Sequence, residues 1–293
     1  MADYLTFDQH PKLNRPVLIM AFEGWNDAAD AASGALEILM DKLGATHFAS
    51  IDPEEFYSFT DTRPTVRLVD DIRELEWPSI DFSFHNRGDG GRDLLFLQGS
   101  EPQLKWRTFT GLVSGLAEEL EVSMVVSLGA LLAEVPHTHT VRVTGGSSDP
   151  ELGSILGLER STYEGPTGIL GVLHQSLREK GLPSVSLWAN VPHYIPALPN
   201  PRASKALLGR VGALLDLKLD LADLDERTTE FDEQIQQGLA QNPEVAQYVR
   251  ELESRVDDED EAPRPAPELP TGESLVADLE KYLRAQREGG RPD

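Results

Sequence analysis

Three histidines are the residues of this sequence best suited to metal binding or proton transfer. His137 and His139 are two positions apart, a spacing that places both imidazoles on one side of an extended segment. His193 follows a later apolar run and can join them if two strand ends are neighbours, with Glu164 as a carboxylate partner. Zinc needs three or four converging ligands. We therefore assign no metal and expect these histidines to bond loop backbone groups or to line a polar cleft.

A polar loop, Glu23-Gly-Trp-Asn-Asp27, is the second candidate site, with Glu23, Trp25, Asn26 and Asp27 as possible ligand contacts. It leaves an apolar run and enters a predicted helix, which is where α/β folds usually place such contacts. The same residues also have a structural explanation, because Asn and Asp are favoured helix caps and Gly24 is a normal turn residue. The structural role is favoured, and the ligand role stays open.

A glycine-rich segment, Gly165-Pro-Thr-Gly168-Ile-Leu-Gly171, is the third candidate, represented by Gly165, Thr167 and Gly168. Free backbone amides at a helix start can hold a phosphate or a carboxylate. The segment matches neither the phosphate loop with its lysine nor the dinucleotide fingerprint, so close packing of a helix is the favoured explanation. The sequence has no cysteine and no serine in the pattern G-x-S-x-G, which excludes thiolate chemistry and disfavours a serine hydrolase. No catalytic residue or cofactor is assigned.

Apolar runs and helical spacings alternate over most of the chain, and these elements must position the candidates. Apolar runs predict strands at 16–22, 46–51, 65–69, 93–97, 124–128, 140–144 and 185–189. Apolar residues at helical spacing predict helices over 28–43, 106–120, 165–180 and 201–217. This alternation predicts an α/β fold with a mixed or mainly parallel sheet flanked by helices, and ligands would gather at the strand carboxyl ends.

The composition changes after about residue 221. Residues 221–293 contain 20 acidic and 8 basic side chains, so they carry half of the net charge of −24. We predict four parts: an α/β core over 1–222, a helical extension over 223–256, an acidic proline-rich linker over 257–270, and a terminal amphipathic helix and tail over 271–293. The linker is too acidic and too rich in proline to bury much surface, which predicts that residues beyond it are separable from the core.

Charge and hydropathy limit the partners of the chain. With 26 basic and 50 acidic side chains, it would be repelled by nucleic acid and by anionic lipid surfaces. The N-terminus lacks a signal-peptide pattern, and no apolar run has the length of a membrane span, so we expect a cytoplasmic protein. The apolar stripes of the C-terminal helices need a covering surface, which predicts self-association into a homo-oligomer.

Several of these segments, taken together, resemble the proteasome assembly chaperone 2 family, and more narrowly its actinobacterial members. The resemblance covers roughly residues 10 to 220. The segments that carry it, in matching order and spacing, are Glu23–Asp30, Glu55–Phe59, Thr62–Pro64, Gly99–Pro102 with Trp106, Leu128–Ala130, Pro136 with His137, Gly165–Gly168 and Pro183–Pro192.

The resemblance implies a three-layer α/β fold similar to phosphorylase- and hydrolase-like proteins, and no established enzyme activity. It also implies proteasome subunits as partners, because relatives in eukaryotes and archaea help to assemble or bind the proteasome α ring. In those relatives a C-terminus of the form hydrophobic-Tyr-any residue can insert into α-ring pockets. This chain ends Glu288-Gly-Gly-Arg-Pro-Asp293, so the resemblance does not extend to that tail. The leading hypothesis is a non-enzymatic chaperone-like protein, and the alternative is an enzyme or small-molecule binder that uses one cleft.

Overall fold

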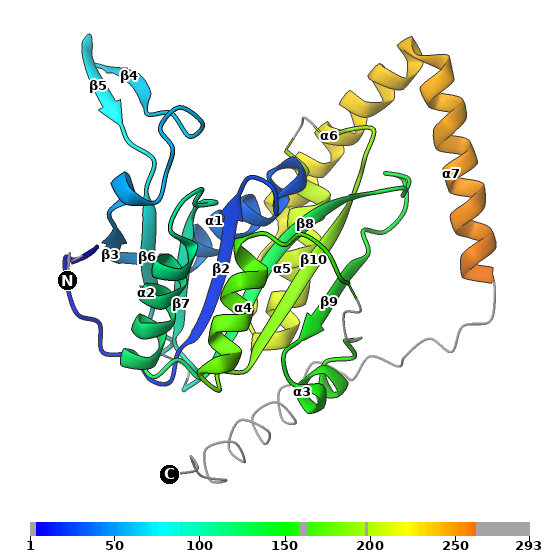
Figure 1. The fold of residues 1–293 in the computed structure, drawn as a ribbon. Coiled ribbons are helices and arrows are strands. Elements are labelled where there is room, and N and C mark those ends of the chain that lie inside the picture. The colour runs from blue at the N-terminus through cyan, green and yellow to red at the C-terminus, as the bar shows by residue number, and fades with distance from the viewer. Residues whose placement is uncertain (1–3, 89, 159–162, 197–198, 262–293) are drawn as a thin grey trace. The chain divides into compact units, whose positions relative to one another are not determined.

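The computed structural model of the chain describes all residues except 1–3, 89, 159–162, 197–198 and 262–293 (Figure 1). The chain forms two compact units. Unit 1 comprises Met1–Asn26, Leu36–Ser127 and Thr162–Val185. Unit 2 comprises Asp27–Ala35, Leu128–Ser161 and Ser186–Asp293.

One mixed sheet of eight strands organises the fold, in the order β1-β3-β6-β7-β2-β8-β10-β9. Strands β7, β2 and β8 are parallel to one another, whereas β1, β3, β6 and β7 pair antiparallel. The strands are β1 (Leu5–Phe7), β2 (Val17–Glu23), β3 (Thr46–Ile51), β6 (Ile80–His85), β7 (Leu94–Ser100), β8 (Met124–Ala133), β9 (Val143–Ser147) and β10 (Ser184–Pro192).

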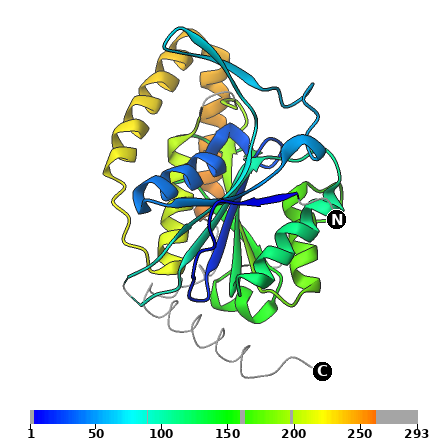
Figure 2. The same cartoon turned by 90° about the vertical axis from the view of Figure 1, so that its left-hand side faces the viewer.

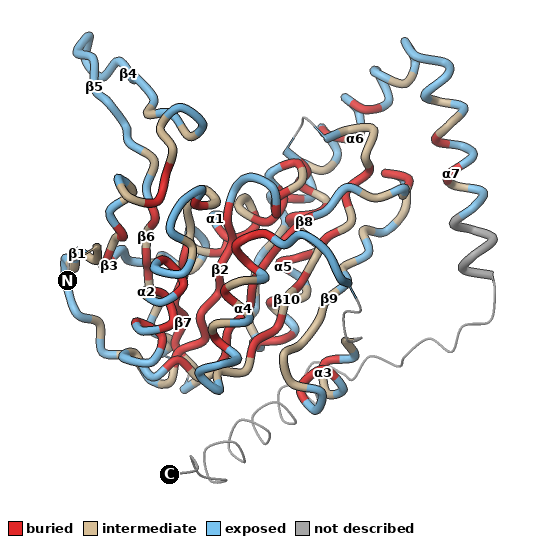
Figure 3. The backbone as a smooth tube through the Cα atoms, viewed as in Figure 1, coloured by how far each residue is buried: buried red, intermediate tan, exposed pale blue. Residues whose placement is uncertain are grey.

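The core of unit 1 surrounds β2. Six consecutive residues, Val17–Phe22, are buried, because the strand is uninterruptedly apolar and lies between β7 and β8 (Figure 3). Helices α2 (Trp106–Glu119) and α4 (Ile169–Glu179) pack against each other, and each turns a row of leucine, valine or phenylalanine side chains inward. The part of helix α1 (Ala31–Leu43) that belongs to unit 1 buries Leu36 and Leu39.

Unit 2 contains four of the helices that the structure describes. These are α3 (Pro150–Ile155), α5 (Pro201–Leu215), α6 (Ala222–Gln241) and α7 (Pro243–Glu261). Helix α5 begins with Asn200, whose side chain accepts a hydrogen bond from the Ala203 amide, and with a proline in its first turn. Helices α6 and α7 are joined by a sharp turn at Asn242 and diverge from it (Figures 1 and 2).

Strands β4 (Thr65–Val69) and β5 (Ile72–Glu76) form a separate two-stranded hairpin in unit 1 rather than joining the large sheet. Every residue of both strands is exposed, and the hairpin is pale blue throughout in Figure 3. The two-residue turn is made by Asp70 and Asp71, both with positive φ, as a tight hairpin turn requires. The apolar run at 65–69 therefore predicts a strand correctly, but it does not indicate that this strand pairs only with β5, outside the large sheet.

The predicted α/β class is confirmed, and most predicted elements lie within a few residues of the observed ones. The helix predicted from Gly165 begins at Ile169, and the strand predicted at 140–144 lies at Val143–Ser147. The pattern missed β1, β5, β6 and the short α3. Helix α7 runs to Glu261, into the stretch predicted to be a linker, whereas the predicted terminal helix over 271–293 lies outside the described residues.

Candidate functional site

The loops after β2 and β7 meet at one edge of unit 1, as the carboxyl ends of neighbouring parallel strands do. Glu23 at the end of β2 accepts a hydrogen bond from the Ser100 hydroxyl at 2.8 Å. Glu101 follows β7, and its Oε1 accepts hydrogen bonds from Asn26 Nδ2 at 2.8 Å and from the Ile169 amide at 2.7 Å. Three loops distant in sequence are thereby joined through one carboxylate.

Gly168 is sterically required at this junction. A Cβ built on Gly168 would lie 2.5 Å from Asn26 Oδ1 and 2.7 Å from Glu101 Oε1, closer than such atoms normally approach. Asn26 is buried, so its side chain has little room to move away. The glycine predicted to serve helix packing therefore serves the approach of two polar side chains.

The start of α4 is occupied by a carboxylate of the chain itself. The sequence indicated that backbone amides at this helix start could bind a phosphate or carboxylate ligand. In the structure the Ile169 amide donates to the Glu101 carboxylate. A negative charge here is favourable because the helix dipole places partial positive charge at its N-terminus. Glu164, Gly165 and Thr167 lie on the exposed loop that leads into the helix.

Trp25 is an exposed large side chain of this edge, with 67% of its surface accessible. It lies between Gly24 and the buried Asn26, whose contact with Glu101 fixes the backbone of the loop. A large aromatic side chain held in solvent by a fixed loop is suited to contact with another macromolecule.

Asp27 belongs to unit 2 and acts as a helix cap. Its carboxylate accepts hydrogen bonds from the Ala32 amide at 2.6 Å and the Ser33 amide at 3.2 Å, and from the Ser33 hydroxyl. Burial raises the pKa of Asp27, while these hydrogen bonds act in the opposite direction. The capping role expected from the sequence is thus visible in the structure.

His137 in unit 2 is tied to a tyrosine. Its backbone N–H donates to the Tyr194 hydroxyl oxygen at 2.8 Å, and its Nδ1 lies 2.7 Å from the same oxygen. The Tyr194 hydroxyl therefore contacts His137 through both its backbone amide and its ring. Burial lowers the pKa of His137 and raises that of Tyr194 to about 12, so both groups remain neutral near pH 7.

His193 and His139 connect to helix α7 and its neighbours rather than to each other. The Nδ1 of His193 lies 3.2 Å from the Ala133 carbonyl oxygen, and its Nε2 lies 3.3 Å from the Tyr248 hydroxyl on α7. The Nδ1 of His139 lies 3.3 Å from Thr138 Oγ1, which donates to Glu253 on α7 at 2.6 Å. These contacts join α7 to the segments that follow β8 and β10.

Apart from Asp27, the sequence candidates fall into two groups, one near Glu101 in unit 1 and one near Tyr194 and Tyr248 in unit 2. The residues named for the single cleft of the alternative hypothesis belong to both units. Within the part of the chain that the structure describes, no group of three or more His, Asp or Glu side chains is arranged to hold a metal ion. Each histidine of the second group already has a partner for a ring nitrogen.

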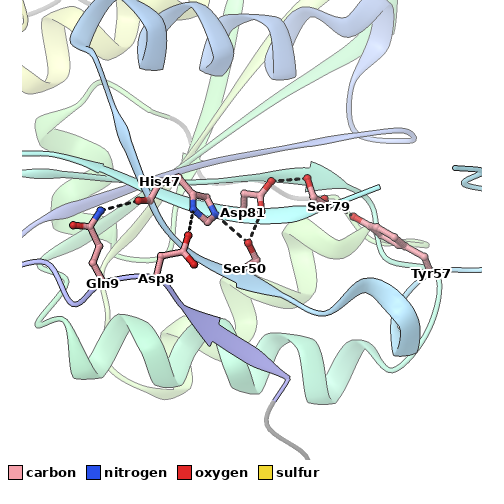
Figure 4. Close-up of polar contacts among 7 residues, drawn as sticks. All are labelled: Asp8, Gln9, His47, Ser50, Tyr57, Ser79 and Asp81. Atoms are coloured by element: carbon pink, nitrogen blue, oxygen red, sulfur yellow. Dashed lines mark hydrogen bonds and ion pairs between the residues drawn. The ribbon is translucent and has the colours of Figure 1, made fainter. Parts of the chain in front are cut away.

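Sequence reasoning missed a histidine network on β3, shown in Figure 4. His47 Nδ1 lies 2.9 Å from Asp8 Oδ2, and its Nε2 lies 2.9 Å from Ser50 Oγ. Residues three apart on a regular strand point to opposite faces, but the register of β3 shifts between His47 and Ala49. This β-bulge brings His47 and Ser50 to one face, beside Asp81 of β6.

The order Asp8, His47, Ser50 resembles a serine-hydrolase triad, but the proton of Ser50 points elsewhere. The Ser50 hydroxyl donates to Asp81 Oδ1 at 2.7 Å, so its single proton is not directed to His47. In a nucleophilic triad the serine donates to the histidine. The network instead links the N-terminal segment to β3 and β6, with Gln9 adding a bond to the His47 carbonyl.

A second histidine of unit 1 lies among buried serines. His174 on α4 has Nε2 2.7 Å from the Ser127 hydroxyl of β8 and Nδ1 2.8 Å from the Ser184 hydroxyl of β10. Both serines are fully buried. Burial lowers the pKa of His174 to about 4, so the ring is neutral and fastens the helix to two strands.

Comparison with known proteins places this geometry in a family. The model of the PAC2 family matches residues 21–239, which is most of the chain. The chain belongs to the PAC2 family. The match includes the edge formed by Glu23, Asn26, Glu101 and Gly168, and it ends within α6.

Solved structures of similar proteins have the same fold. A PAC2 family protein from Streptomyces avermitilis is 45% identical, with a TM-score of 0.74 over 80% of this chain and 99% of that one. A proteasome-assembly chaperone homologue from Mycobacterium tuberculosis is 40% identical, with a TM-score of 0.72 over the same shares. A Mycobacterium tuberculosis protein of unknown function is 29% identical, with a TM-score of 0.80 over 98% of this chain and 97% of that one.

The comparison with curated proteins gave no match. Among the helices that the structure describes, none is long and apolar enough to cross a membrane.

The residues that complete these networks carry weak sequence signals. Glu101 and Pro102 directly follow a buried strand, and this position alone marks Glu101 as a candidate. Tyr194 is adjacent to His193, but Tyr248 lies on α7, some fifty residues later, and only the fold brings it to the histidine. His47, in a predicted strand, gave no signal because the bulge beside it is not visible in the pattern.

Proposed function

We propose that this PAC2 protein is a chaperone-like, non-enzymatic protein that binds proteasome components in the cytoplasm. The observation that carries the proposal is the family match over residues 21–239, together with 40% identity to a proteasome-assembly chaperone homologue. The geometry is consistent with it, because the polar groups at the candidate edge are bonded to one another. The amide at the start of α4 already has an internal carboxylate partner.

The contact surface that we assign to this function is the edge around Trp25. Its loop is held by the buried Asn26 and by Glu101, so binding loses little backbone entropy. Exposed tryptophans on rigid supports are the side chains that most often dominate binding energy. Tyr163, also 67% exposed, lies on the loop that leads into α4 and adds a second aromatic ring to unit 1.

The direct test mixes the purified full chain with purified proteasome α-type subunits and follows complex formation by native mass spectrometry. We expect a complex, and we expect Trp25→Ala to weaken it at least about tenfold, the loss typical of a central tryptophan. Trp25→Phe is the matched control, because it keeps an aromatic ring and should retain most of the affinity.

Two results would overturn the proposal. If the wild-type chain forms no complex with α-type or β-type subunits at concentrations of tens of micromolar, the partner is wrong. If a complex forms and Trp25→Ala binds as tightly as wild type, the partner stands and the assigned surface is wrong.

A further inference from the structure

Three neighbouring segments at one edge of unit 1 each present an exposed large apolar side chain. Trp25 follows β2, Leu104 follows β7, and Tyr163 lies on the segment that leads into α4. Trp25 and Tyr163 are each 67% exposed, and Leu104 is 47% exposed. The Glu101 carboxylate bonds to Asn26 in the first segment and to the amide at the start of α4, so the three segments are held to one another. The apolar side chains therefore belong to one connected edge of unit 1.

The same three segments contain glutamates and no basic residue. They are Glu23-Gly-Trp-Asn26, Glu101-Pro-Gln-Leu104 and Tyr163-Glu-Gly-Pro-Thr-Gly168. One glutamate lies in each segment, namely Glu23, Glu101 and Glu164. Among the residues that the structure describes, no lysine, arginine or histidine is bonded to any of these three carboxylates. Their negative charge is therefore not neutralised within the edge.

The charged residues next to these segments leave the balance negative. Lys105 directly follows the second segment and forms an ion pair with Glu55. Gln103 attaches the loop 58–63 through side-chain hydrogen bonds, and this loop contains one aspartate and one arginine. Arg107 lies in the first turn of α2. With these neighbours counted, the edge holds five acidic and three basic side chains.

We propose that this edge binds a segment of the partner in which apolar side chains alternate with lysines or arginines. The inference rests on the proposed function, because it specifies what the contact surface around Trp25 recognises. The faces of tryptophan and tyrosine rings attract cations and also provide apolar contact. Glu23 uses one carboxylate oxygen for the Ser100 hydroxyl, and its other oxygen is bonded to no donor among the described residues. A lysine or arginine can therefore bond there without displacing an internal partner.

The combination of apolar and acidic side chains distinguishes this edge from the other acidic surfaces. The first turns of α6 and α7 are acidic, but within the described part of these helices Val245 is the one exposed large apolar side chain. Exposed ion pairs alone add little affinity. Apolar burial supplies most of the binding energy, and charge complementarity selects the partner.

The first experiment measures the dissociation constant of the full chain for purified proteasome α-type subunits at two salt concentrations. From about 50 mM to about 1 M NaCl the Debye length falls from above about 10 Å to about 3 Å, which screens exposed charges. Glu23→Gln combined with Glu164→Gln should weaken binding about three- to tenfold at the lower salt concentration and hardly at the higher one. Glutamine at position 23 keeps an oxygen that can accept the Ser100 hydroxyl proton.

The matched control removes the same two charges elsewhere in unit 1. Glu119 ends α2, and Glu121 follows it, both exposed. A helix of this length spans about 20 Å, so both residues lie far from Leu104, which precedes its start. Glu119→Gln combined with Glu121→Gln should bind as the wild type does. Equal losses in the two double variants would show that net charge alone acts, and this overturns the proposed recognition.

The second experiment needs no proteasome subunit and uses two synthetic helical peptides as probes. One has leucines on one face and lysines on the other, and its counterpart has glutamate in place of every lysine. Calorimetric titration of the full chain should detect the lysine peptide with a dissociation constant below about 1 mM, and not the glutamate peptide. Trp25→Ala and the Glu23, Glu164 double variant should each weaken lysine-peptide binding at least about threefold, whereas the control variant should not.

The two experiments separate this inference from the proposed function. A subunit complex that is insensitive to salt and to the Glu23, Glu164 double variant overturns the inference and leaves the proposed function standing. If no subunit complex forms and the lysine peptide binds at the edge, the proposed function is wrong and the recognition of basic segments stands. If no subunit complex forms and the lysine peptide is not bound, or is bound equally by every variant, the inference is wrong as well.

Discussion

Two histidines of unit 1 make nearly the same hydrogen bonds in opposite surroundings. His174 lies between two fully buried serine hydroxyls, with nitrogen-to-oxygen distances of 2.7 and 2.8 Å. His47 lies between the Asp8 carboxylate and the Ser50 hydroxyl, both at 2.9 Å, with 41% of its side chain exposed. Hydrogen-bond distances therefore do not distinguish a network that stabilises the core from one on the surface, whereas burial does.

Burial therefore determines which polar groups of this protein stabilise the fold. A buried hydroxyl that loses its partner is not rehydrated, so removal of the partner costs its full desolvation penalty. When an exposed carboxylate or imidazole loses its partner, water takes the partner's place, and the free energy of unfolding changes little. Four substitutions or conditions, in decreasing order of expected effect, test this gradient.

The largest effect is expected for His174→Ala. It removes a ring from the core of unit 1 and with it a hydrogen-bond partner of the buried Ser127 hydroxyl. We expect the free energy of unfolding to fall by about 3 kcal/mol, from the cavity and the lost hydrogen bond. Urea denaturation at pH 7 measures this. A loss below about 1 kcal/mol would show that water replaces the ring.

The next effect is a dependence of stability on pH. The folded pKa of His174 is about 4, below its ordinary value, so between pH 6.5 and 4 the unfolded chain binds a proton that the native chain does not. Stability should therefore decrease as pH falls through this range, by roughly 2 to 3 kcal/mol. The difference in unfolding free energy between wild type and His174→Gln, measured at pH 7 and pH 4.5, isolates this contribution, and an equal difference at both values would contradict it.

The stability loss expected at the network around Glu101 is smaller than that at the buried His174 and larger than that at the exposed His47. Gly168→Ala tests this network. The added methyl group would meet Asn26 and Glu101 at 2.5 to 2.7 Å, so the loop or the helix start must shift. We expect a loss of about 1 to 3 kcal/mol in thermal or urea unfolding. Gly111→Ala is the control, because nothing lies within 4 Å of its added Cβ on the exposed side of α2, and helix propensity favours alanine by about 1 kcal/mol.

The smallest effect is expected for His47→Ala. The partners Asp8 and Ser50 remain accessible to solvent after the ring is removed, so the free energy of unfolding should change by at most about 0.5 kcal/mol. Urea denaturation of this variant beside His174→Ala compares the two histidines directly. Equal losses in the two variants would break the distinction between buried and exposed networks.

The sequence predicted much of the fold because its signals are local. The apolar run at Val17–Phe22 predicted a buried central strand, and Asp27 was predicted as a capping residue before the next helix. It could not place the 65–69 strand, because a strand pattern does not specify its pairing partner, and here the partner is the adjacent β5.

The candidate site was predicted in part for the same reason. Glu23, Asn26 and Gly168 lie together as loops at strand ends do, but Glu101, which joins them, was not singled out. His137, His139 and His193 were treated as one possible set, and the structure gives each a separate partner. Which ring nitrogen meets which hydroxyl depends on contacts between residues far apart in sequence.

By itself the sequence determined the α/β class, the acidic character and the resemblance to a family, because periodicity, charge and motif order are properties of the chain. The tertiary structure alone decided that Glu101 occupies the start of α4, that a bulge aligns His47 with Ser50, and that the β4–β5 hairpin exposes its apolar face. These three features depend on strand register and loop approach. Neither leaves a trace in local sequence, because both are fixed by packing between distant segments.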